Sequence, residues 1–168
     1  MIFFVDTNIF LYAIGPVFQF QGPSKTFLRE VVEERYRAVT STEVFQEVLH
    51  QCDGKGRRAR GIEGIRDFRS FLQEVLPVTD ADIQSAETLI SQYPSLKIRD
   101  AIHVAVMKNH GIFDLVSYDK DFDVIKDIQR VEPPDVSDQF LVQETTDRYH
   151  GRKVKKISLV EGSRRSRL

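Results

Sequence analysis

The sequence has a single cysteine and no long hydrophobic run. Cys52 is the only cysteine among the 168 residues, which excludes an intramolecular disulfide and a zinc site built from cysteines. No apolar run approaches the roughly 20 residues that a membrane-spanning helix needs. Met1 leads directly into an apolar segment, without the basic region and cleavage site of a secretory signal. These absences predict a cytoplasmic protein that does not associate with membranes.

The charge is unevenly distributed, although the formal net charge is only −1. Acids outnumber bases in residues 1–147, whereas Glu161 is the only acid in residues 148–168. An acidic body is suited to cations, and a basic tail is suited to phosphate or is simply solvated. We expect one domain over residues 1–134 and a basic C-terminal extension over 135–168. The tail bases are Arg152, Lys153, Lys155, Lys156, Arg164, Arg165 and Arg167.

Strand-like and helix-like patterns alternate along the first 134 residues. Short apolar runs predict strands at 1–5, 112–117 and 128–131, with 37–40 a strand or connector, and a weaker pattern suggests one at 154–160. Apolar residues at helical spacing predict helices at 25–36, 41–50, 62–75, 79–92 and 98–107, with 9–14 a helix or extended turn. Glycine-rich segments at 15–24 and 52–61 are expected to be loops. The alternation predicts an α/β fold, a three-layer α/β/α sandwich with a mainly parallel central sheet.

Acidic residues follow two of the predicted strands. Asp6 follows the first strand and Asp119 follows strand 112–117, and ligands of open α/β sheets bind at the carboxyl ends of strands. Asp6 alone is equally well explained as a helix cap. Glu47 and Asp100 lie on predicted helices, and Asp100 begins an apolar segment where an unpaired carboxylate is costly. Four carboxylates can therefore meet at one rim of the sheet.

An oxygen-only cluster of this kind favours particular metals and a particular reaction. Carboxylate oxygens select hard divalent cations, Mg²⁺ or Mn²⁺, over zinc. Such cations can activate water and stabilise the leaving oxygen in phosphodiester cleavage. The sequence therefore predicts a metal-dependent hydrolase as one candidate function.

Four short blocks of residues resemble a known family. They are residues 5–8 (VDTN), Ser41 with Glu47 six residues later, residues 99–105 (RDAIHVA) and residues 116–122 (VSYDKDF). In this order they resemble PIN-domain ribonucleases, and among these the VapC-type toxins of prokaryotic toxin–antitoxin pairs. The resemblance covers residues 1 to about 131.

The resemblance implies a PIN-like fold and an Mg²⁺- or Mn²⁺-dependent endoribonuclease that cleaves RNA, with an antitoxin partner and a homodimer. It implies that the catalytic and metal-binding residues are Asp6, Glu47, Asp100 and Asp119, supported by Asn8 and Ser117. Glu43, one turn before Glu47, is an alternative ligand. Asp121 and Asp123 are alternatives to Asp119, which is closest to the strand end.

Several other polar residues have two interpretations. His103 lies in so apolar a stretch that we expect a core residue rather than a ligand. Arg99 is expected to reach solvent or to pair with a neighbouring acid. The basic residues of segment 52–61 either bind RNA phosphates or are merely solvated, and they are Lys55, Arg57, Arg58 and Arg60.

Two other function classes compete with the nuclease. A non-catalytic RNA- or protein-binding module would keep the fold and use the basic tail. A phosphatase of the haloacid dehalogenase type also begins with Asp after its first strand, but it expects a second Asp two residues later. This chain has Asn8 there, which disfavours the phosphatase.

Overall fold

The computed structural model describes residues 2–16 and 18–136. Its central sheet is parallel throughout, with the strand order β3-β2-β1-β4-β5. The strands are β1 (Ile2–Val5), β2 (Arg37–Ser41), β3 (Glu74–Leu76), β4 (Asp114–Val116) and β5 (Gln129–Val131). Because β1 is central, its carboxyl end lies between those of β2 and β4.

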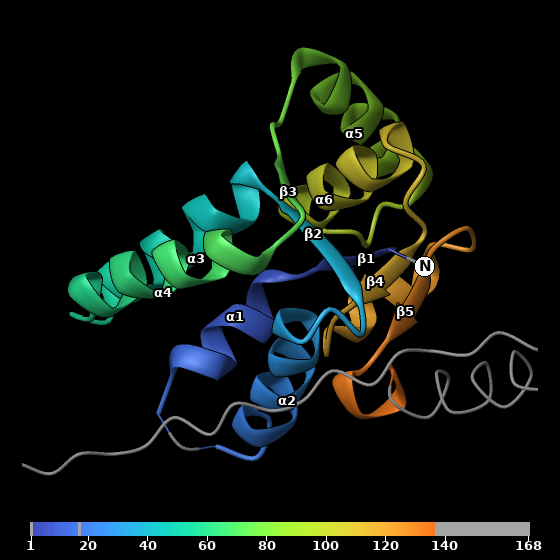
Figure 1. Ribbon diagram of the computed structural model, residues 1–168. Coiled ribbons are helices and arrows are strands. Elements are labelled where there is room, and N and C mark those ends of the chain that lie inside the picture. The colour runs from blue at the N-terminus through green and yellow to red at the C-terminus, as the bar shows by residue number, and fades with distance from the viewer. Residues whose placement is uncertain (1, 17, 137–168) are drawn as a thin grey trace, which may run out of the picture.

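Helices cover both faces of the sheet (Figure 1). In that view α5 and α6 lie on one side of the strands and α1 and α2 on the other, while α3 and α4 extend side by side away from the sheet. The α-helices are α1 (Thr7–Ile14), α2 (Gln21–Val32), α3 (Thr42–Gly54), α4 (Arg58–Phe71), α5 (Asp80–Gln92) and α6 (Ile98–Asn109). A 3₁₀ helix, η1 (Lys120–Val124), follows β4. The predicted three-layer α/β/α sandwich is confirmed.

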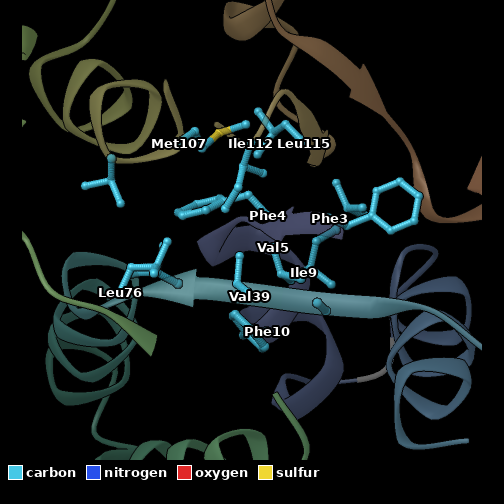
Figure 2. Close-up of a cluster of buried hydrophobic side chains, with 14 of the residues drawn as sticks. Phe3, Phe4, Val5, Ile9, Phe10, Val39, Leu76, Met107, Ile112 and Leu115 are labelled. Atoms are coloured by element: carbon cyan, nitrogen blue, oxygen red, sulfur yellow. The ribbon is translucent and has the colours of Figure 1, made fainter. Parts of the chain in front are cut away.

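The core is built around β1, whose residues are apolar in succession because helices cover both of its faces. Phe4 faces α6, where its ring lies 6.0 Å from that of His103. Phe3 faces α2, where its ring packs edge-on against Phe27 at 6.3 Å. Figure 2 shows these β1 side chains among the buried residues of β2, β4, α1 and α6. This packing fixes the position of the residues that follow β1.

Strand β3 was not expected from the sequence. The predicted helix over 62–75 is wrong at both ends, because α4 begins at Arg58 and ends at Phe71. Residues 74–76 pair with β2 instead, with Val75 opposite Thr40. Pairing with a neighbouring strand, a non-local contact, overrides the local helical pattern there. Segment 37–40, predicted as a strand or connector, is part of strand β2, and the predicted strand at 128–131 is confirmed as β5.

The two predicted glycine-rich loops are also wrong in part. Helix α2 begins at Gln21, so Pro23 lies in its first turn, where a missing amide hydrogen is tolerated. Most of segment 52–61 is helical, because α3 continues to Gly54 and α4 starts at Arg58. Gly56, with a φ of +65°, makes the tight turn between them.

The predicted C-terminal extension lies almost wholly outside the described residues, as do its basic residues and the suggested strand at 154–160. Val136, just past the expected boundary at 134, is fully buried. The division into 1–134 and 135–168 stays a prediction. Within the described ranges, no helix is long and apolar enough to cross a membrane.

The α3–α4 pair packs closely at a glycine. A Cβ added at Gly61 would lie 2.7 Å from the Cβ of Cys52, which is far shorter than a normal contact. Cys52 is a buried free cysteine on α3, so its Cβ cannot move without moving the helix. Glycine at position 61 therefore permits the close approach of the two helices.

We predict that Gly61→Ala destabilises the protein by about 1–3 kcal/mol, because overpacking forces the helices apart. Gly54→Ala is the matched control, since nothing lies within 4 Å of a Cβ added there. The control should be neutral or slightly stabilising. Denaturant unfolding of the two variants measures the difference, and equal stabilities would contradict the prediction.

Candidate active site

Asp6 lies at the carboxyl end of β1 and caps helix α1. Its Oδ1 accepts a hydrogen bond from the backbone amide of Thr7 at 2.7 Å. Its Oδ2 faces the neighbouring strand end, where it accepts from the Ser117 hydroxyl at 2.6 Å. Asp6 is therefore both a helix cap and part of a polar cluster, so the two interpretations of the sequence are compatible.

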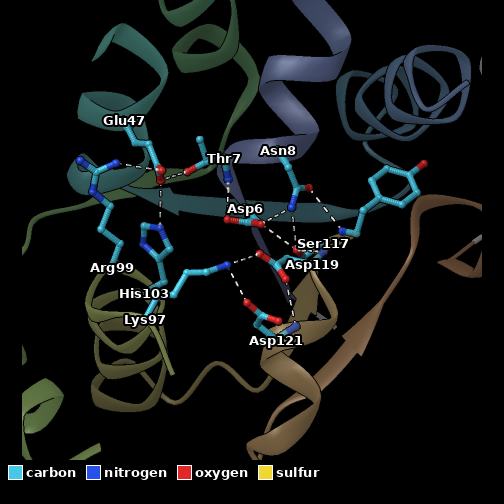
Figure 3. A network of polar contacts seen from close by, with 11 residues as sticks. Asp6, Thr7, Asn8, Glu47, Lys97, Arg99, His103, Ser117, Asp119 and Asp121 are labelled. Atoms are coloured by element: carbon cyan, nitrogen blue, oxygen red, sulfur yellow. Dashed lines mark hydrogen bonds and ion pairs between the residues drawn. The ribbon is translucent and has the colours of Figure 1, made fainter. Parts of the chain in front are cut away.

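Ser117 and Asn8 connect the ends of β1 and β4 (Figure 3). The Ser117 hydroxyl donates to Asp6 and accepts from the Asn8 amide group and from the backbone amide of Asp119, both at 2.9 Å. Asn8 also donates to Asp6 and accepts from the backbone amide of Tyr118. A hydroxyl has one donor and two acceptor positions, so Ser117 is fully used. The network holds Asp6 and Asp119 at the same edge of the sheet.

Glu47 approaches this edge from α3, which is capped by Ser41. Its Oε2 accepts from the Thr7 hydroxyl at 2.8 Å, and its Oε1 accepts from Arg99 at 3.1 Å. The imidazole of His103 lies 3.6 Å from the same carboxylate. His103, Thr7 and Arg99 stabilise the charged form and lower the pKa of Glu47 to about 2, against the opposing effect of burial.

Glu43 lies farther from the cluster than Glu47. Its carboxylate contacts Arg99 at 3.9 Å, and it has no contact with Thr7 or His103 among the interactions of the described residues. The expectation that Arg99 pairs with a neighbouring acid is confirmed. His103 is buried in the core, as predicted, but it also lies against Glu47.

Asp100, Asp119 and Asp121 form the tightest acidic group in the described part of the chain. One carboxylate oxygen from each lies within 4.8 Å of the others. Asp100 comes from the first turn of α6, and the other two come from the start of η1. Lys97 contacts Asp121 at 2.6 Å and Asp119 at 3.6 Å (Figure 3). This single ammonium group offsets only part of the negative charge.

Burial and the charges of neighbouring acids raise the pKa values of Asp6 and Asp100. Burial raises the pKa of Asp6, although the nearby His103 and the hydrogen bond from Ser117 oppose the shift. Burial raises the pKa of Asp100 from 3.8 to about 6, and the charges of Asp6 and Asp119 add to the effect. The Oδ2 of Asp100 is buried and has no hydrogen-bond partner. Such an oxygen is suited to binding a cation.

The structure thus brings Asp6, Glu47, Asp100 and Asp119 to the carboxyl edge of the sheet, with Asn8, Ser117 and Asp121. Asp123 is directed elsewhere and pairs with Arg130 at 2.6 Å. Sequence reasoning assigned no role to Thr7 or Lys97. Thr7 stands between two residues already singled out, so its position was a usable signal, whereas the reach of Lys97 depends on the turn before α6.

The basic residues of segment 52–61 separate into two sets. Arg58 pairs with Asp53 at 2.7 Å on the outside of the α3–α4 pair. Lys55, Arg57 and Arg60 line a cavity that also includes Asn8. Three of the four predicted RNA-binding residues therefore line a cavity that extends to Asn8, a hydrogen-bond partner of Asp6.

Comparison with known proteins gives the family. A model of the PIN domain matches residues 3–128. The chain belongs to the PIN-domain family. This PIN-domain chain is 35% identical to ribonuclease VapC23 of Mycobacterium tuberculosis over 116 residues, which are 69% of this chain and 91% of the relative. It is 32% identical to ribonuclease VapC13 of the same organism over 127 residues, which are 76% and 97% of the two chains. The predicted resemblance to VapC-type proteins is confirmed.

Solved structures share the fold of this PIN-domain chain. Mycobacterium tuberculosis VapC20, a toxin that cleaves the sarcin–ricin loop, aligns with a TM-score of 0.63 and 20% identity, covering 74% of this chain and 95% of its own. VapBC2 of Rickettsia felis, bound to a DNA fragment from its promoter, aligns with a TM-score of 0.63 and 17% identity, covering 79% and 98%. At these identities the likeness shows the fold alone.

The raised pKa of Asp100 predicts a pH-dependent cost in stability. A carboxyl group whose folded-state pKa lies above its unfolded value destabilises the protein increasingly as pH rises from about 4 to about 6. In EDTA-treated protein, Asp100→Asn should therefore raise the free energy of unfolding at pH 7 by about 1–2 kcal/mol, a figure discounted for solvent screening. The gain should vanish near pH 4.

Denaturant unfolding at several pH values measures this effect. Asp127→Asn is the control, because Asp127 is exposed and lies at the surface beside Lys108. That substitution should change stability by less than about 0.5 kcal/mol. A gain for Asp100→Asn that is the same at pH 4 and pH 7 would show that ionisation is not the cause.

Proposed function

We propose that this VapC-type protein is an endoribonuclease that hydrolyses RNA phosphodiester bonds with Mg²⁺ or Mn²⁺ and acts as a toxin. Its curated relatives at 32–35% identity are named ribonucleases. The observation that carries the metal dependence is the buried Oδ2 of Asp100, which lacks a partner beside the oxygens of Asp119 and Asp121. The non-catalytic alternative gives no reason for such a costly group.

The residues present fit a hard divalent cation. Their donors are carboxylate oxygens, which Mg²⁺ and Mn²⁺ prefer, and the negative charge exceeds what Lys97 offsets. Asp100, Asp119 and Asp121 would hold the cation. A bound cation of this kind supplies the positive charge that acidifies a water molecule and stabilises the developing charge on the leaving oxygen.

The remaining acids complete the proposed catalytic set from fixed positions. Asp6 is oriented by Thr7, Asn8 and Ser117, so its carboxylate is held toward the cluster without a conformational search. Glu47 is oriented by Thr7 and Arg99, and it would bind a cation only in exchange for part of its contact with Arg99. We propose Glu47, rather than Glu43, as the fourth acid because it alone contacts Thr7.

A protein partner is also part of the proposal. Structures with the same fold are toxin–antitoxin complexes, among them those of Rickettsia felis and Klebsiella pneumoniae. We propose that a cognate antitoxin inhibits this chain and that the chain forms a homodimer. Size-exclusion chromatography with light scattering tests the dimer, and co-expression with the neighbouring gene product tests the antitoxin.

We predict that the purified protein cleaves single-stranded RNA with Mn²⁺ and that EDTA abolishes cleavage. Asp100→Asn should lower the rate by about 10²-fold or more, because it removes a ligand and charge at the centre of the acidic group. Gel analysis of an end-labelled RNA pool measures both effects. Asp127→Asn removes an equivalent acid away from the site and should retain wild-type activity.

Two outcomes would contradict this prediction. Full activity of folded Asp100→Asn would exclude a central role for that carboxylate. Cleavage that persists in EDTA would exclude metal dependence. Circular dichroism of the variant establishes that a lost activity does not come from unfolding.

We also predict where the cation binds. Crystals soaked in Mn²⁺ should show an anomalous peak among Asp100, Asp119 and Asp121, because the unpartnered oxygen lies there. Any acid of α3 that approaches the peak should be Glu47. A peak bounded by Glu43, or a peak far from Asp100, would overturn the assignment.

A further inference from the structure

A cavity of about 420 Å³ lies beside the acidic cluster and has no role in the reaction described above. Its lining residues come from α1 and the segment after it, from the end of α3, and from the turn and start of α4 that follow. Its size falls within the range of about 300–1,000 Å³ typical of small-molecule sites. The lining residues that matter here are Asn8, Tyr12, Phe18, Lys55, Arg57 and Arg60.

The cavity is continuous with the candidate active site. Asn8 lines it and also donates hydrogen bonds to Asp6 and Ser117. Tyr12 lines it too, and burial together with the charges of Asp119 and Asp6 raises the pKa of the Tyr12 hydroxyl. One end of the cavity, at Asn8 and Tyr12, therefore borders the acids, so an RNA strand held at the acids can extend into it.

The cations of the cavity are not neutralised by the protein. Within the described ranges, the side chains of Lys55 and Arg57 form no ion pair or hydrogen bond. Arg60 donates to the carbonyl of Ile14 at 3.3 Å and lies only 3.8 Å from Glu63. Arg58, by contrast, is paired with Asp53 and lies outside the cavity. This excess positive charge fits an anionic occupant.

The aromatic wall fits a planar occupant. Phe18 lines the cavity and is 55% exposed, so burial in the core does not explain this large apolar side chain. Its ring lies 6.2 Å from that of Tyr12, which also contacts the rings of Phe20 and Tyr118. The contacts with Phe20 and Tyr118 hold the Tyr12 ring in place. Aromatic rings beside cations are the usual arrangement for binding an unpaired nucleotide.

We propose that this cavity, the nucleotide pocket, binds one unpaired nucleotide of the RNA next to the cleaved bond, with its base stacked on Phe18 and Tyr12 and its phosphate at Lys55 and Arg57. The inference rests on the proposed function and adds a selection rule to it. A paired base cannot enter the pocket, so the substrate must be single-stranded at this nucleotide. A peptide segment is the competing occupant, and the uncompensated cations together with the exposed ring favour RNA.

Steady-state cleavage of a single-stranded oligoribonucleotide tests the stacking. Phe18→Ala should raise KM by roughly 5- to 150-fold, the range found when a base-stacking aromatic is removed, with a smaller effect on kcat. Phe113→Ala is the matched control, because Phe113 is 48% exposed and precedes β4, at the opposite edge of the sheet. Equal KM values for the two variants would overturn the stacking role.

The salt dependence of KM tests the phosphate contact. Arg57→Ala should lower the slope of log KM against log salt by about 0.7, the loss of one phosphate contact in a single strand. Arg66→Ala removes the same charge from the exposed face of α4 and should leave the slope unchanged. An unchanged slope for Arg57→Ala would overturn this contact.

A binding measurement separates failure of the pocket from failure of the proposed function. The Asp100→Asn protein is titrated with oligoribonucleotides that carry 2-aminopurine at successive positions. The pocket is supported if the fluorescence is quenched at one position of the RNA. This quenching should be lost when Phe18→Ala is added to Asp100→Asn and kept when Phe113→Ala is added instead. Wild-type cleavage without any Phe18-dependent quenching overturns the pocket and leaves the nuclease intact. Quenching without wild-type cleavage overturns the nuclease and supports an RNA-binding role for the pocket.

Discussion

Repulsion among carboxylates at one partly buried edge of the sheet is the constraint on which the rest of this structure depends. Asp6, Asp100 and Asp119 are brought together because parallel strands end at the same edge and α6 begins there. Burial raises the pKa of Asp100 to about 6, and the charges of Asp6 and Asp119 add to the effect. The buried core around β1 supplies the stability that keeps these groups close in spite of their charge.

The acids of the site differ in how many hydrogen-bond and ion-pair partners they have. Asp6 is surrounded by donors, and Glu47 has a hydroxyl and a guanidinium, so neither is short of partners. Asp100 keeps an oxygen with none. Lys97 lies at the exposed side of the group and contacts the two acids of η1. The fixed donors therefore set the positions of Asp6 and Glu47, whereas the carboxylate oxygen that lacks a partner belongs to Asp100.

The architecture and most of the site could be predicted from the sequence, because both depend on local signals. Apolar runs followed by acids marked β1 and β4, and the placement of Asp6 and Asp119 followed from parallel strand ends. The features that could not be predicted depend on contacts between residues far apart in the sequence. Residues 74–76 become a strand only by pairing with β2, and segment 52–61 becomes helical only where Gly61 lets α4 pack on α3. The contact of Lys97 with η1 likewise has no local signature.

The α3–α4 pair extends away from the sheet (Figure 1), contributes Glu47 to the edge where the acids lie, and lines the neighbouring cavity with residues near its tip. Insertions or deletions around Gly56 would alter the wall of the neighbouring cavity while the strand ends kept their register. Two residues link these parts: Asn8, which lines the cavity and contacts Asp6, and Glu47, which lies about two turns before the end of α3. If the proposed roles hold, such a division allows the choice of RNA to diverge in evolution while the machinery for breaking the bond stays the same.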